Sequence, residues 1–522
     1  MAVSCNRFVT GALFTRSSRT LEGIERVDCM VNWFEKRCLL APDHIAIIDG
    51  DTGERWSYRE AEIRACRVAG YLQSHGVAKG DRVALLSRND VCYFDLLFAC
   101  GKLGAIFVPL NWRLSANELR YILDDCTPKA VVIHDDMQTL WDGEASPYKV
   151  ISISDAEYEA ALQSDISPAV TEQVHSSDPF AIIYTGGTTG KPKGVVLSHA
   201  SIFWNSVNTV LSWNLTSNDI TPTYMPMFHT GGLNALSLPV LQIGGTVIVS
   251  KAFDADKTIE LINREHCTII LLVPTMYHML IKSPLFAATD FPAMHTFLSG
   301  GAPCPHTVYQ AFVAKGLNFK EGYGLTEAGP NNFYIHPEMA AIKIGSVGKP
   351  MILNDIKITD SEGEETKPGE VGEIMLRGGH LFESYWRLPE ATAQAFTDGW
   401  LHTGDLGRKD EDGYFYIMGR KKDMIITGGE NVYPLEVEHL IRQHPSVKEA
   451  VVVGLPDDKW GEVVAAVVVT LEGSELDEEQ LREYCACSIG KYKVPKKFFY
   501  VDELPKTPVG KIDINRIVQS YS

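Results

Sequence analysis

The sequence predicts an α/β protein: a large N-terminal domain of βαβ-type sheets with a β-rich subdomain, followed by a smaller α+β C-terminal domain. Its 522 residues exceed one typical domain, and 45% apolar with 22% charged residues is ordinary for a globular protein. Strand and helix patterns alternate up to about residue 350. From Ile356 short strands alternate with charged turns, and after Gly419 a segment of about 100 residues mixes both kinds of element.

Residue periodicity predicts the individual elements. In the N-terminal domain, helices are expected at 29–38, 58–74 and 94–103, and buried strands at 81–86, 105–110, 181–184 and 195–199, with further units around Val131, Val247 and Ile269. In the C-terminal domain, helices are expected at 434–443 and 477–487, and strands at 450–453 and 463–469. This alternation predicts parallel sheets covered by helices.

The segment 184–194, which reads Tyr-Thr-Gly-Gly-Thr-Thr-Gly-Lys-Pro-Lys-Gly, lies between two apolar runs. Its glycines let backbone N–H groups approach an anion, its threonine hydroxyls add hydrogen bonds, and its lysines add positive charge. It is not a Walker A loop, because no glycine lies five residues before Gly190 and Lys191 is followed by Pro192. The segment therefore predicts polyphosphate binding in a different architecture.

This segment resembles the phosphate-binding signature of the adenylate-forming (AMP-binding) superfamily, which contains acyl- and aryl-CoA synthetases, luciferases and nonribosomal adenylation domains. Further motifs of the superfamily follow in its order over nearly the whole chain. Gly186 departs from the pattern, since many members carry serine there, and the backbone cradle is expected to remain. The resemblance implies contacts with ATP from Thr185, Gly186, Gly187, Thr188, Thr189, Gly190, Lys191 and Lys193.

Three motifs resemble the part of the superfamily site that holds AMP. In the segment 322–327, the resemblance implies that Thr326 meets the phosphate and that Glu327 holds Mg²⁺, which takes carboxylate and phosphate oxygens. Asp405 corresponds to the residue that accepts hydrogen bonds from both ribose hydroxyls. The resemblance places the following residues around adenine and AMP: Gly300, Gly301, Ala302, Pro303, Tyr323 and Gly324.

Near residue 420 the chain resembles the superfamily hinge. Arg420 is implied to contact the ribose or the phosphate, and Lys422 corresponds to the residue about which a mobile C-terminal domain swings. The resemblance thus divides the chain into a domain at 21–418, a hinge at 419–422 and a domain at 423–522.

The mobile domain carries two more motifs. Gly428 and Gly429 correspond to a loop that lines the pantetheine tunnel of CoA. Lys511, in the sequence P-x-T-x-x-G-K near the C-terminus, corresponds to the catalytic lysine. A cation at that position stabilises the negative charge that develops while pyrophosphate leaves.

The acid pocket is less well defined by the sequence. No acidic residue lies between Met225 and Leu233, where amino-acid-activating relatives carry an aspartate, so an amino acid substrate is disfavoured. Asn331 and Asn332 follow Pro330 where an apolar wall is expected, which predicts that part of the substrate is polar. The resemblance implies a lining of Phe228, His229, Gly232, Leu233, Gly301, Gly324, Pro330 and Asn331.

Composition restricts the partners and the compartment. A formal charge of −18 disfavours nucleic acid and anionic membranes as partners, and no apolar run reaches the length of a membrane span. Eleven cysteines, without metal-ligand spacing, predict reduced thiols and a cytoplasmic protein. Residues 1–20 are expected to form an irregular leader, although they share basic residues and a lack of acids with transit peptides. A homodimer is left open.

Together these patterns predict an ATP-dependent acid–CoA ligase, with Mg²⁺ accompanying ATP and with CoA as co-substrate. A carboxylic acid and ATP would give acyl-AMP and pyrophosphate, and the thiol of CoA would then displace AMP. A fatty or arylalkanoic acid is the expected substrate, and short functionalised acids stay open. Two alternatives remain: an enzyme that passes the acyl group to a carrier protein, and a nucleotide-binding protein without catalytic activity.

Overall fold

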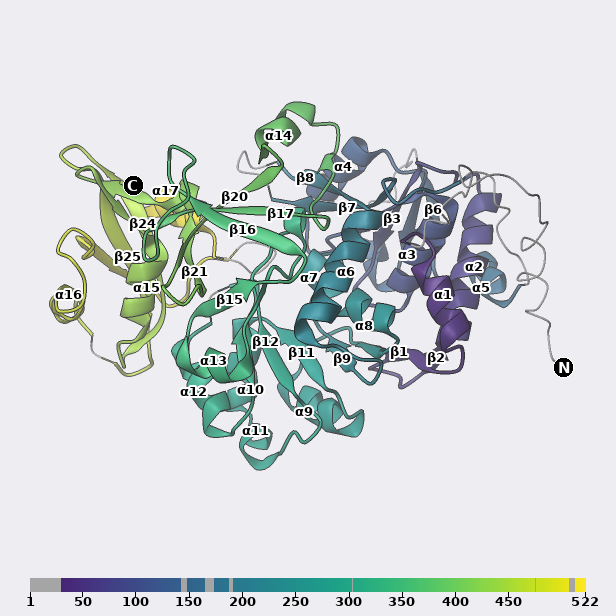
Figure 1. Ribbon diagram of the computed structural model, residues 1–522, viewed down its shortest axis with the longest axis horizontal. Helices are drawn as coiled ribbons and strands as arrows, with labels where there is room; N and C mark the ends of the chain where they lie inside the picture. The colour runs from purple at the N-terminus through teal and green to yellow at the C-terminus, as the bar shows by residue number, and fades with distance from the viewer. Residues whose placement is uncertain are drawn as a thin grey trace.

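The computed structural model describes residues 30–141, 148–164, 173–186, 191–302, 304–474, 476–506 and 512–522. Its long axis runs from the N-terminal helices to a C-terminal sheet at the opposite end of the molecule (Figure 1). The predicted leader at residues 1–20 lies outside the described residues.

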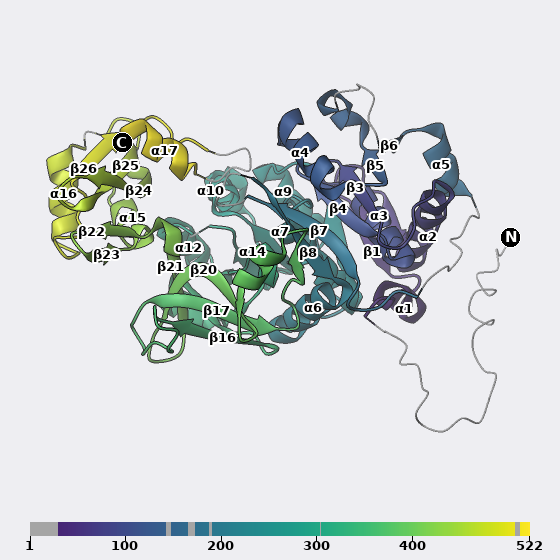
Figure 2. The ribbon, with the colours of Figure 1, turned by 90° about the horizontal axis from the view of Figure 1, so that it is seen from above.

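A seven-stranded mixed sheet forms the centre of the N-terminal part, with helices against it (Figures 1 and 2). Across the sheet the strands are β18 (Ser384–Tyr385), β8 (Lys193–Ser198), β7 (Pro179–Thr185), β4 (Ile106–Leu110), β3 (Arg82–Leu86), β5 (Ala130–Ile133) and β6 (Lys149–Ser152). Strands β7, β4, β3, β5 and β6 are parallel, as the predicted βαβ units require. β8 is antiparallel to β7, so the two strands around the glycine-rich segment form a hairpin.

Two smaller sheets lie beside each other below the large one in Figure 1. The first contains β2 (Arg55–Ser57), β1 (Ile45–Asp49), β10 (Thr246–Val249) and β9 (Ile220–Thr223). The second contains β11 (Ile269–Leu272), β12 (Thr296–Ser299) and β13 (Phe319–Glu321), all parallel. The backbone N–H of Thr268 donates to the carbonyl oxygen of Ile220 at 2.9 Å and joins the edges of the two sheets.

The short strands predicted from Ile356 belong to a β-rich sheet of antiparallel strands. Its strands, in order, are β14 (Phe333–Tyr334), β15 (Ser346–Pro350), β21 (Phe415–Arg420), β20 (Trp400–Lys409), β17 (Gly372–Gly378) and β16 (Asn354–Thr359), with β19 (Phe396–Thr397) beside β20. Because β20 and β21 are adjacent, residues far apart in the predicted motifs meet across this pair.

The C-terminal part is an α+β unit, as predicted. Its sheet contains β23 (Glu430–Val432), β22 (Ile425–Thr427), β25 (Gly461–Thr470) and β24 (Val447–Asp457), with β26 (Lys497–Tyr500) parallel to β25. The two predicted strands of this part are present but longer than expected, since β24 and β25 pair along almost their whole length. The predicted fold class is therefore confirmed.

The helices follow the predicted order, and local capping explains several boundaries. Helix α2 begins after Ser57, whose side chain accepts from the N–H of Glu60, and it spans the predicted residues. The N-terminal helices are α1 (Trp33–Leu40), α2 (Tyr58–Ser74), α3 (Cys92–Leu103), α4 (Ala116–Cys126), η2 (Asp135–Leu140), α5 (Ala156–Gln163), α6 (His199–Trp213), α7 (Thr230–Leu233), α8 (Ser237–Ile243), α9 (Ala255–Arg264), α10 (Pro274–Lys282), α11 (Pro284–Ala288) and α12 (His306–Ala314). The later helices are η3 (Thr326–Ala328), α13 (Pro337–Ile342), α14 (Pro389–Gln394), η4 (Lys421–Asp423), α15 (Pro434–Arg442), α16 (Glu478–Ala486) and α17 (Ile514–Tyr521).

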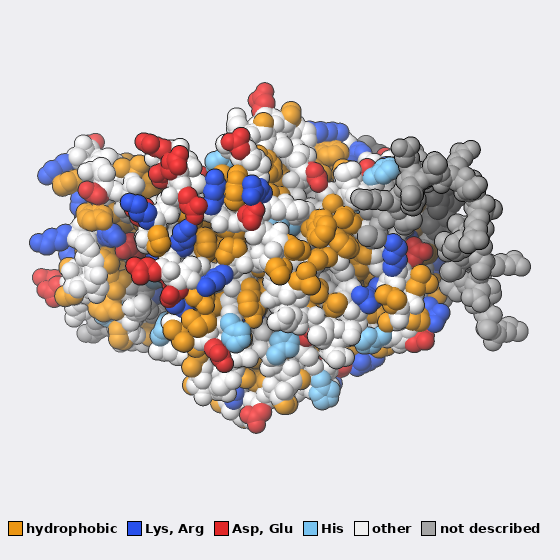
Figure 3. Space-filling model, in the orientation of Figure 1, with side chains coloured by type: hydrophobic (Ala, Val, Ile, Leu, Met, Phe, Trp, Pro, Cys, Tyr) orange, Lys and Arg blue, Asp and Glu red, His pale blue; other side chains and the backbone are white. Residues whose placement is uncertain are grey.

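The surface mixes the two signs of charge. On the face shown in Figure 3, acidic and basic side chains are interspersed, and hydrophobic side chains gather near the middle of the molecule. Among the described helices, none combines the length and the apolar character needed to cross a bilayer.

Candidate active site

Two loops leave neighbouring parallel strands at the same edge of a sheet. Ser299 ends β12 opposite Glu321, which ends β13, and the N–H of Gly322 donates to the carbonyl oxygen of Ser299 at 2.8 Å. Gly301 has a φ of +81°, a conformation that favours glycine. The predicted adenine turn (Gly300, Gly301 and exposed Ala302) and the segment 322–327 thus begin side by side; Pro303 lies outside the described residues.

Glu321 forms hydrogen bonds with the residues that follow the predicted adenine turn. Its Oε1 accepts from the hydroxyl of Tyr309 at 2.7 Å, and its Oε2 accepts from the N–H of Cys304 at 3.3 Å. Burial of the carboxylate raises the pKa of Glu321 to about 7. No motif indicated this residue, because its partners lie earlier in the chain, in helix α12 and in the turn after β12.

The loop that follows β13 folds tightly on itself. A Cβ atom on Gly324 would lie 2.2 Å from the carbonyl carbon of Pro330, so only glycine fits there. The N–H of Leu325 donates to the oxygen of Gly329 at 3.1 Å, and Thr326 is buried at the start of the short helix η3. This loop therefore holds Thr326 and Glu327 in a fixed backbone frame.

Tyr323, Asp405 and Arg420 meet, as their predicted roles around one nucleotide require. The hydroxyl of Tyr323 donates to Asp405 Oδ2 at 2.6 Å, and Arg420 Nε lies 2.8 Å from Asp405 Oδ1. Asp405 and Arg420 stand opposite each other on β20 and β21, and Asp405 is only 5% exposed. A carboxylate in this position can accept hydrogen bonds from a diol.

Glu327 is joined to the glycine-rich hairpin through Tyr385. The hydroxyl of Tyr385 donates to Glu327 Oε1 at 2.9 Å, and Lys193 Nζ lies 5.0 Å from the centre of the Tyr385 ring. Burial and the nearby Glu327 raise the pKa of the Tyr385 hydroxyl, so it remains a donor. Tyr385 was not among the predicted residues; it reaches the site because β18 pairs with β8.

The hairpin itself is described only at its two ends. Thr185 pairs with Lys193 across β7 and β8, Gly186 follows on one side, and Lys191 Nζ lies 5.8 Å from the Tyr121 ring on the other. The predicted phosphate contacts Gly187, Thr188, Thr189 and Gly190 lie outside the described residues.

The predicted acid wall at 226–233 is compact. Phe228 and Leu233 are buried, and a Cβ atom on Gly232 would lie 2.3 Å from the carbonyl oxygen of Pro226. His229 is partly buried, and its ring lies 4.6 Å from that of Phe228. A short turn therefore brings Phe228, His229 and Gly232 close together.

Asn89 supports this wall from the neighbouring sheet. Its Nδ2 donates to the carbonyl oxygen of Met225 at 2.9 Å, and its Oδ1 accepts from the N–H of Met227 at 2.9 Å. Met225 and Met227 come just before Phe228 in the sequence. Their hydrogen bonds with Asn89 therefore position the start of the predicted acid wall. No pattern in the sequence predicted this contact.

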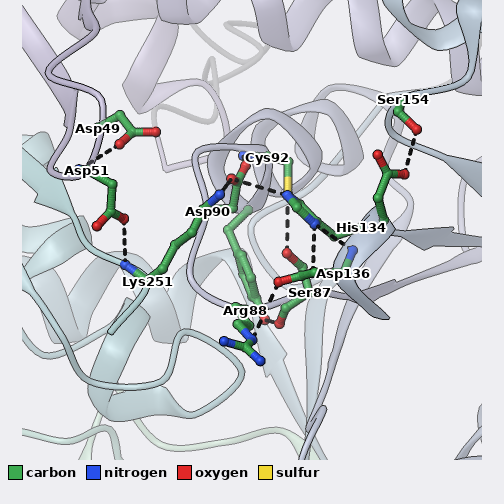
Figure 4. Close-up of polar contacts among 12 residues, drawn as sticks. Asp49, Asp51, Ser87, Arg88, Asp90, Cys92, His134, Asp136, Ser154 and Lys251 are labelled. Atoms are coloured by element: carbon green, nitrogen blue, oxygen red, sulfur yellow. Dashed lines mark hydrogen bonds and ion pairs between the residues drawn. The ribbon is translucent and has the colours of Figure 1, made fainter. Parts of the chain in front are cut away.

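A polar cluster holds the turn that carries Asn89 (Figure 4). His134 lies 2.7 Å from Asp136 through Nδ1 and 3.7 Å from Asp90 through Nε2. Asp90 also lies 3.8 Å from Lys251 Nζ, and Arg88 lies 3.4 Å from Asp136. The cluster therefore connects the ends of β3, β5 and β10.

The predicted lining of the acid pocket also includes Pro330 and Asn331. Asn331 is buried, and its Nδ2 donates to Thr209 Oγ1 at 3.1 Å and to the carbonyl oxygen of Ala235 at 2.7 Å. Both N–H groups of this amide are thus used within the protein. Asn331 ties the wall to helix α6 and to the segment after α7.

Three of the C-terminal candidates, Lys422, Gly428 and Gly429, belong to the described residues. Lys422 is exposed in η4, the connection between β21 and β22, while its neighbour Lys421 lies 2.9 Å from Glu373. Gly428 and Gly429 form the turn between β22 and β23, with positive φ angles of +60° and +86°. Lys511 lies outside the described residues, between Lys506 and Ile512, which pair in an antiparallel bridge.

Glu327 fits the chemistry of a magnesium ligand. A carboxylate offers the hard oxygen atoms that Mg²⁺ prefers, and Tyr385 engages only Oε1. The ion takes its remaining ligands from phosphate oxygens and water in sites of this kind.

Comparison with known proteins agrees with this geometry. The family of AMP-binding enzymes matches residues 34–386, and the AMP-binding enzyme C-terminal domain matches residues 436–511. A feruloyl-CoA synthase from Amycolatopsis sp is 39% identical over 481 residues, which cover 92% of this chain and 96% of that protein. The chain belongs to the family of AMP-binding enzymes.

Solved structures give the same result. ATP-bound MatB from Rhodopseudomonas palustris is 34% identical with a TM-score of 0.88, covering 94% of this chain and 99% of that one. O-succinylbenzoate coenzyme A synthetase from Bacillus subtilis, in complex with ATP and magnesium ion, is 31% identical with a TM-score of 0.83, covering 94% and 99%. The predicted class, an AMP-forming acid–thiol ligase, is confirmed.

The raised pKa of Glu321 leads to a prediction for stability. Between the ordinary carboxyl pKa of 4.5 and a folded-state pKa of about 7, the folded chain holds a proton that the unfolded chain has released. Stability therefore falls as pH rises through this window. Glu321→Gln keeps an acceptor for Cys304 and a donor for Tyr309 without the charge, so it should stabilise the protein by up to about 3 kcal/mol at pH 8.

Thermal unfolding of the wild type and of Glu321→Gln between pH 4 and pH 8 checks this. The difference should vanish at pH 4, and the matched variant of the exposed Glu338, Glu338→Gln, should change little at any pH. A Glu321→Gln variant that is less stable than the wild type at pH 8 would contradict the prediction that the buried, ionised Glu321 carboxylate destabilises the folded protein.

Proposed function

We propose that this chain joins a carboxylic acid to CoA in two half-reactions at the segment 322–327. Two series of contacts that meet at that segment support this proposal. One runs from Lys193 through Tyr385 to Glu327, and the other runs from Tyr323 to Asp405 and Arg420. The first has the charges for a polyphosphate, and the second has acceptors for a ribose.

In the first half-reaction, a carboxylate oxygen of the acid attacks the α-phosphorus of ATP, and pyrophosphate leaves. Asp405 and Arg420 would orient the ribose, and Thr326 with the hairpin lysines would hold the phosphates. Mg²⁺ at Glu327 would supply positive charge for the phosphate oxygens. Lys511 would contribute a cation to the transition state from the C-terminal part.

In the second half-reaction, the thiol of CoA attacks the acyl carbon and AMP leaves. We infer that the part after residue 422 rotates about Lys422, which removes Lys511 and brings the Gly428–Gly429 turn to the site. The exposure of Lys422 in a short connection between two sheets supports this assignment. The domains at 21–418 and 423–522 would then move as two bodies.

The acid is proposed to be an aryl, arylalkanoic or fatty acid. The names of the relatives, feruloyl-CoA synthase and o-succinylbenzoate coenzyme A synthetase, refer to different acids. These names therefore do not identify the acid that this chain uses. Transfer to a carrier protein remains the second candidate for the acceptor. The cytoplasmic setting, based on the cysteines, stays a prediction.

A panel of carboxylic acids tests the proposed function. Pyrophosphate release and CoA-thioester formation are measured in parallel with ATP and Mg²⁺, with CoA or with a phosphopantetheinyl carrier protein as the acceptor. We expect at least one acid to give pyrophosphate and CoA thioester in equal amounts. Pyrophosphate with thioester only on the carrier would favour the second candidate, and no pyrophosphate from any acid would refute catalysis.

A variant of Lys511 tests whether the two half-reactions can be separated. Lys511→Ala should slow pyrophosphate release by about 10²–10³-fold, because the cation is needed only in the first transition state. Supplied acyl-AMP and CoA should still give thioester at a near-normal rate. Lys506→Ala, which removes a lysine at the base of the same segment, is the control; equal loss of both steps in Lys511→Ala would reject the assignment.

A second variant tests the hinge. Helical residues of η4 have φ angles close to that of proline, so Lys422→Pro should keep the described arrangement and hinder its rearrangement. One half-reaction should continue while the other falls at least about tenfold. Stopped-flow measurement of each step compares Lys422→Pro with Lys422→Ala, and unchanged overall turnover in the proline variant would show that no rotation occurs there.

A further inference from the structure

Glu373 contacts the turn that carries Asp405, where the ribose is proposed to bind. This glutamate belongs to β17 and is only 8% exposed. Its Oε1 accepts from the backbone N–H of Gly404 at 3.1 Å, and its Oε2 accepts from Lys421 Nζ at 2.9 Å. His402 Nδ1 lies 3.4 Å from the same Oε2. One buried carboxylate therefore contacts both the proposed ribose turn and the segment proposed as the hinge.

The proposed ribose turn is an irregularity in the pairing of β17 with β20. The residue pairs on either side of it enclose three residues of β20, 403–405, but only one residue of β17, Ile374. Gly404, at the centre of this bulge, has a φ of +69°. A bulge interrupts the ladder of backbone hydrogen bonds, and Glu373 supplies the missing acceptor for Gly404. The Glu373 carboxylate therefore helps to fix the shape of the turn that presents Asp405.

Two consecutive basic residues of the hinge segment pair with acids of this region. Arg420 Nε lies 2.8 Å from Asp405 Oδ1, and Lys421 Nζ lies 2.9 Å from Glu373 Oε2. Their neighbour Lys422, the proposed pivot, is exposed. The last two residues before the pivot are therefore attached to the two acids that line and shape the proposed ribose site.

The ion pair of Glu373 with Lys421 joins a buried partner to an exposed one. The side chain of Glu373 is 9% exposed, and that of Lys421 is 60% exposed. Burial alone would raise the pKa of Glu373, but the hydrogen bond and the charge of Lys421 hold that pKa below its usual value. Water and salt screen the exposed lysine, so the pair contributes only modestly to stability. A contact of this strength can bias an equilibrium between two arrangements and still break in every turnover.

We propose that Glu373 is a positioning residue: its ion pair with Lys421 stabilises the described arrangement of the two parts of the chain and breaks when the part after residue 422 rotates. This rests on the proposed function, whose change between half-reactions the pair regulates. The same carboxylate holds Gly404, so the hinge and the proposed ribose site are coupled. A nucleotide bound at Asp405 and the state of the hinge then affect each other reciprocally.

Removal of the lysine tests the pair without changing the contact to the ribose turn. In Lys421→Met, the rate of pyrophosphate release from ATP and an acid of the panel is measured separately from the rate of thioester formation from supplied acyl-AMP and CoA. We expect the ratio of the two rates to change at least about fivefold, because the described arrangement loses a contact that the rotated one lacks. Lys421→Arg keeps the pair and should keep the ratio. Lys409→Met removes an ion pair with Glu365 elsewhere on β20 and is the matched control, for which the ratio should not change.

Removal of the acid separates the pair from a simple change of charge. Glu373→Gln can keep an oxygen at Gly404 but loses the charge opposite Lys421, so it should shift the ratio in the same direction as Lys421→Met. The two substitutions change the net charge in opposite directions, which distinguishes loss of the pair from loss of one charge. The double variant should shift the ratio no further than either single variant. Glu373→Ala also loses the contact with Gly404, and of these variants only it should raise the KM for ATP, at least about threefold.

The outcomes distinguish the inference from the function on which it rests. An unchanged ratio in Lys421→Met, or opposite shifts in Lys421→Met and Glu373→Gln, overturns the inference and leaves the ligase intact. Should the Glu373 variants fail to fold, the exposed Lys421 decides: higher ionic strength must then shift the ratio in the wild type and not in Lys421→Met, and equal shifts in both overturn the inference. Absence of pyrophosphate and thioester with every acid in the panel overturns the proposed function and the inference with it.

Discussion

The site depends on the parallel register of β12 with β13. Because Ser299 stands opposite Glu321, the turn after one strand and the loop after the other start at the same edge. The contacts that gather the nucleotide residues follow from this register: Tyr323 reaches Asp405 on β20, and Glu327 reaches Tyr385 on β18. A shift by one residue would reverse which side chains of β13 face Tyr309.

Motifs predicted residues whose chemistry is local. Gly324 is required because the backbone of Pro330 occupies the place of a side chain, and such a requirement leaves a visible glycine in the sequence. Asp405 and Arg420 each lie in a recognisable segment, although their contact depends on the pairing of β20 with β21. For Lys511 and the centre of the glycine-rich hairpin, the predicted roles stay predictions.

Residues whose contacts are with segments far away in the sequence were not predicted. Tyr385 is 58 positions from Glu327, and Asn89 is 138 positions from Met227. Neither lies in a patterned segment, since each contact arises from sheet order, which periodicity does not encode. Helix boundaries were easier, because a cap such as Ser57 with Glu60 acts within one turn. Both strands of the hairpin of β7 and β8 were predicted, but their antiparallel pairing was not.

The pairing of β18 with β8 also affects how the chain folds during synthesis. β8 ends at Ser198 and its partner begins at Ser384, so about 190 residues must be made before the edge of the sheet is covered. At a ribosomal rate of about 5–20 residues per second, that strand edge stays open for roughly 10–40 s. An open edge is a template for pairing with other chains. The nascent protein therefore exposes this edge after its glycine-rich hairpin has formed and before Tyr385 has emerged.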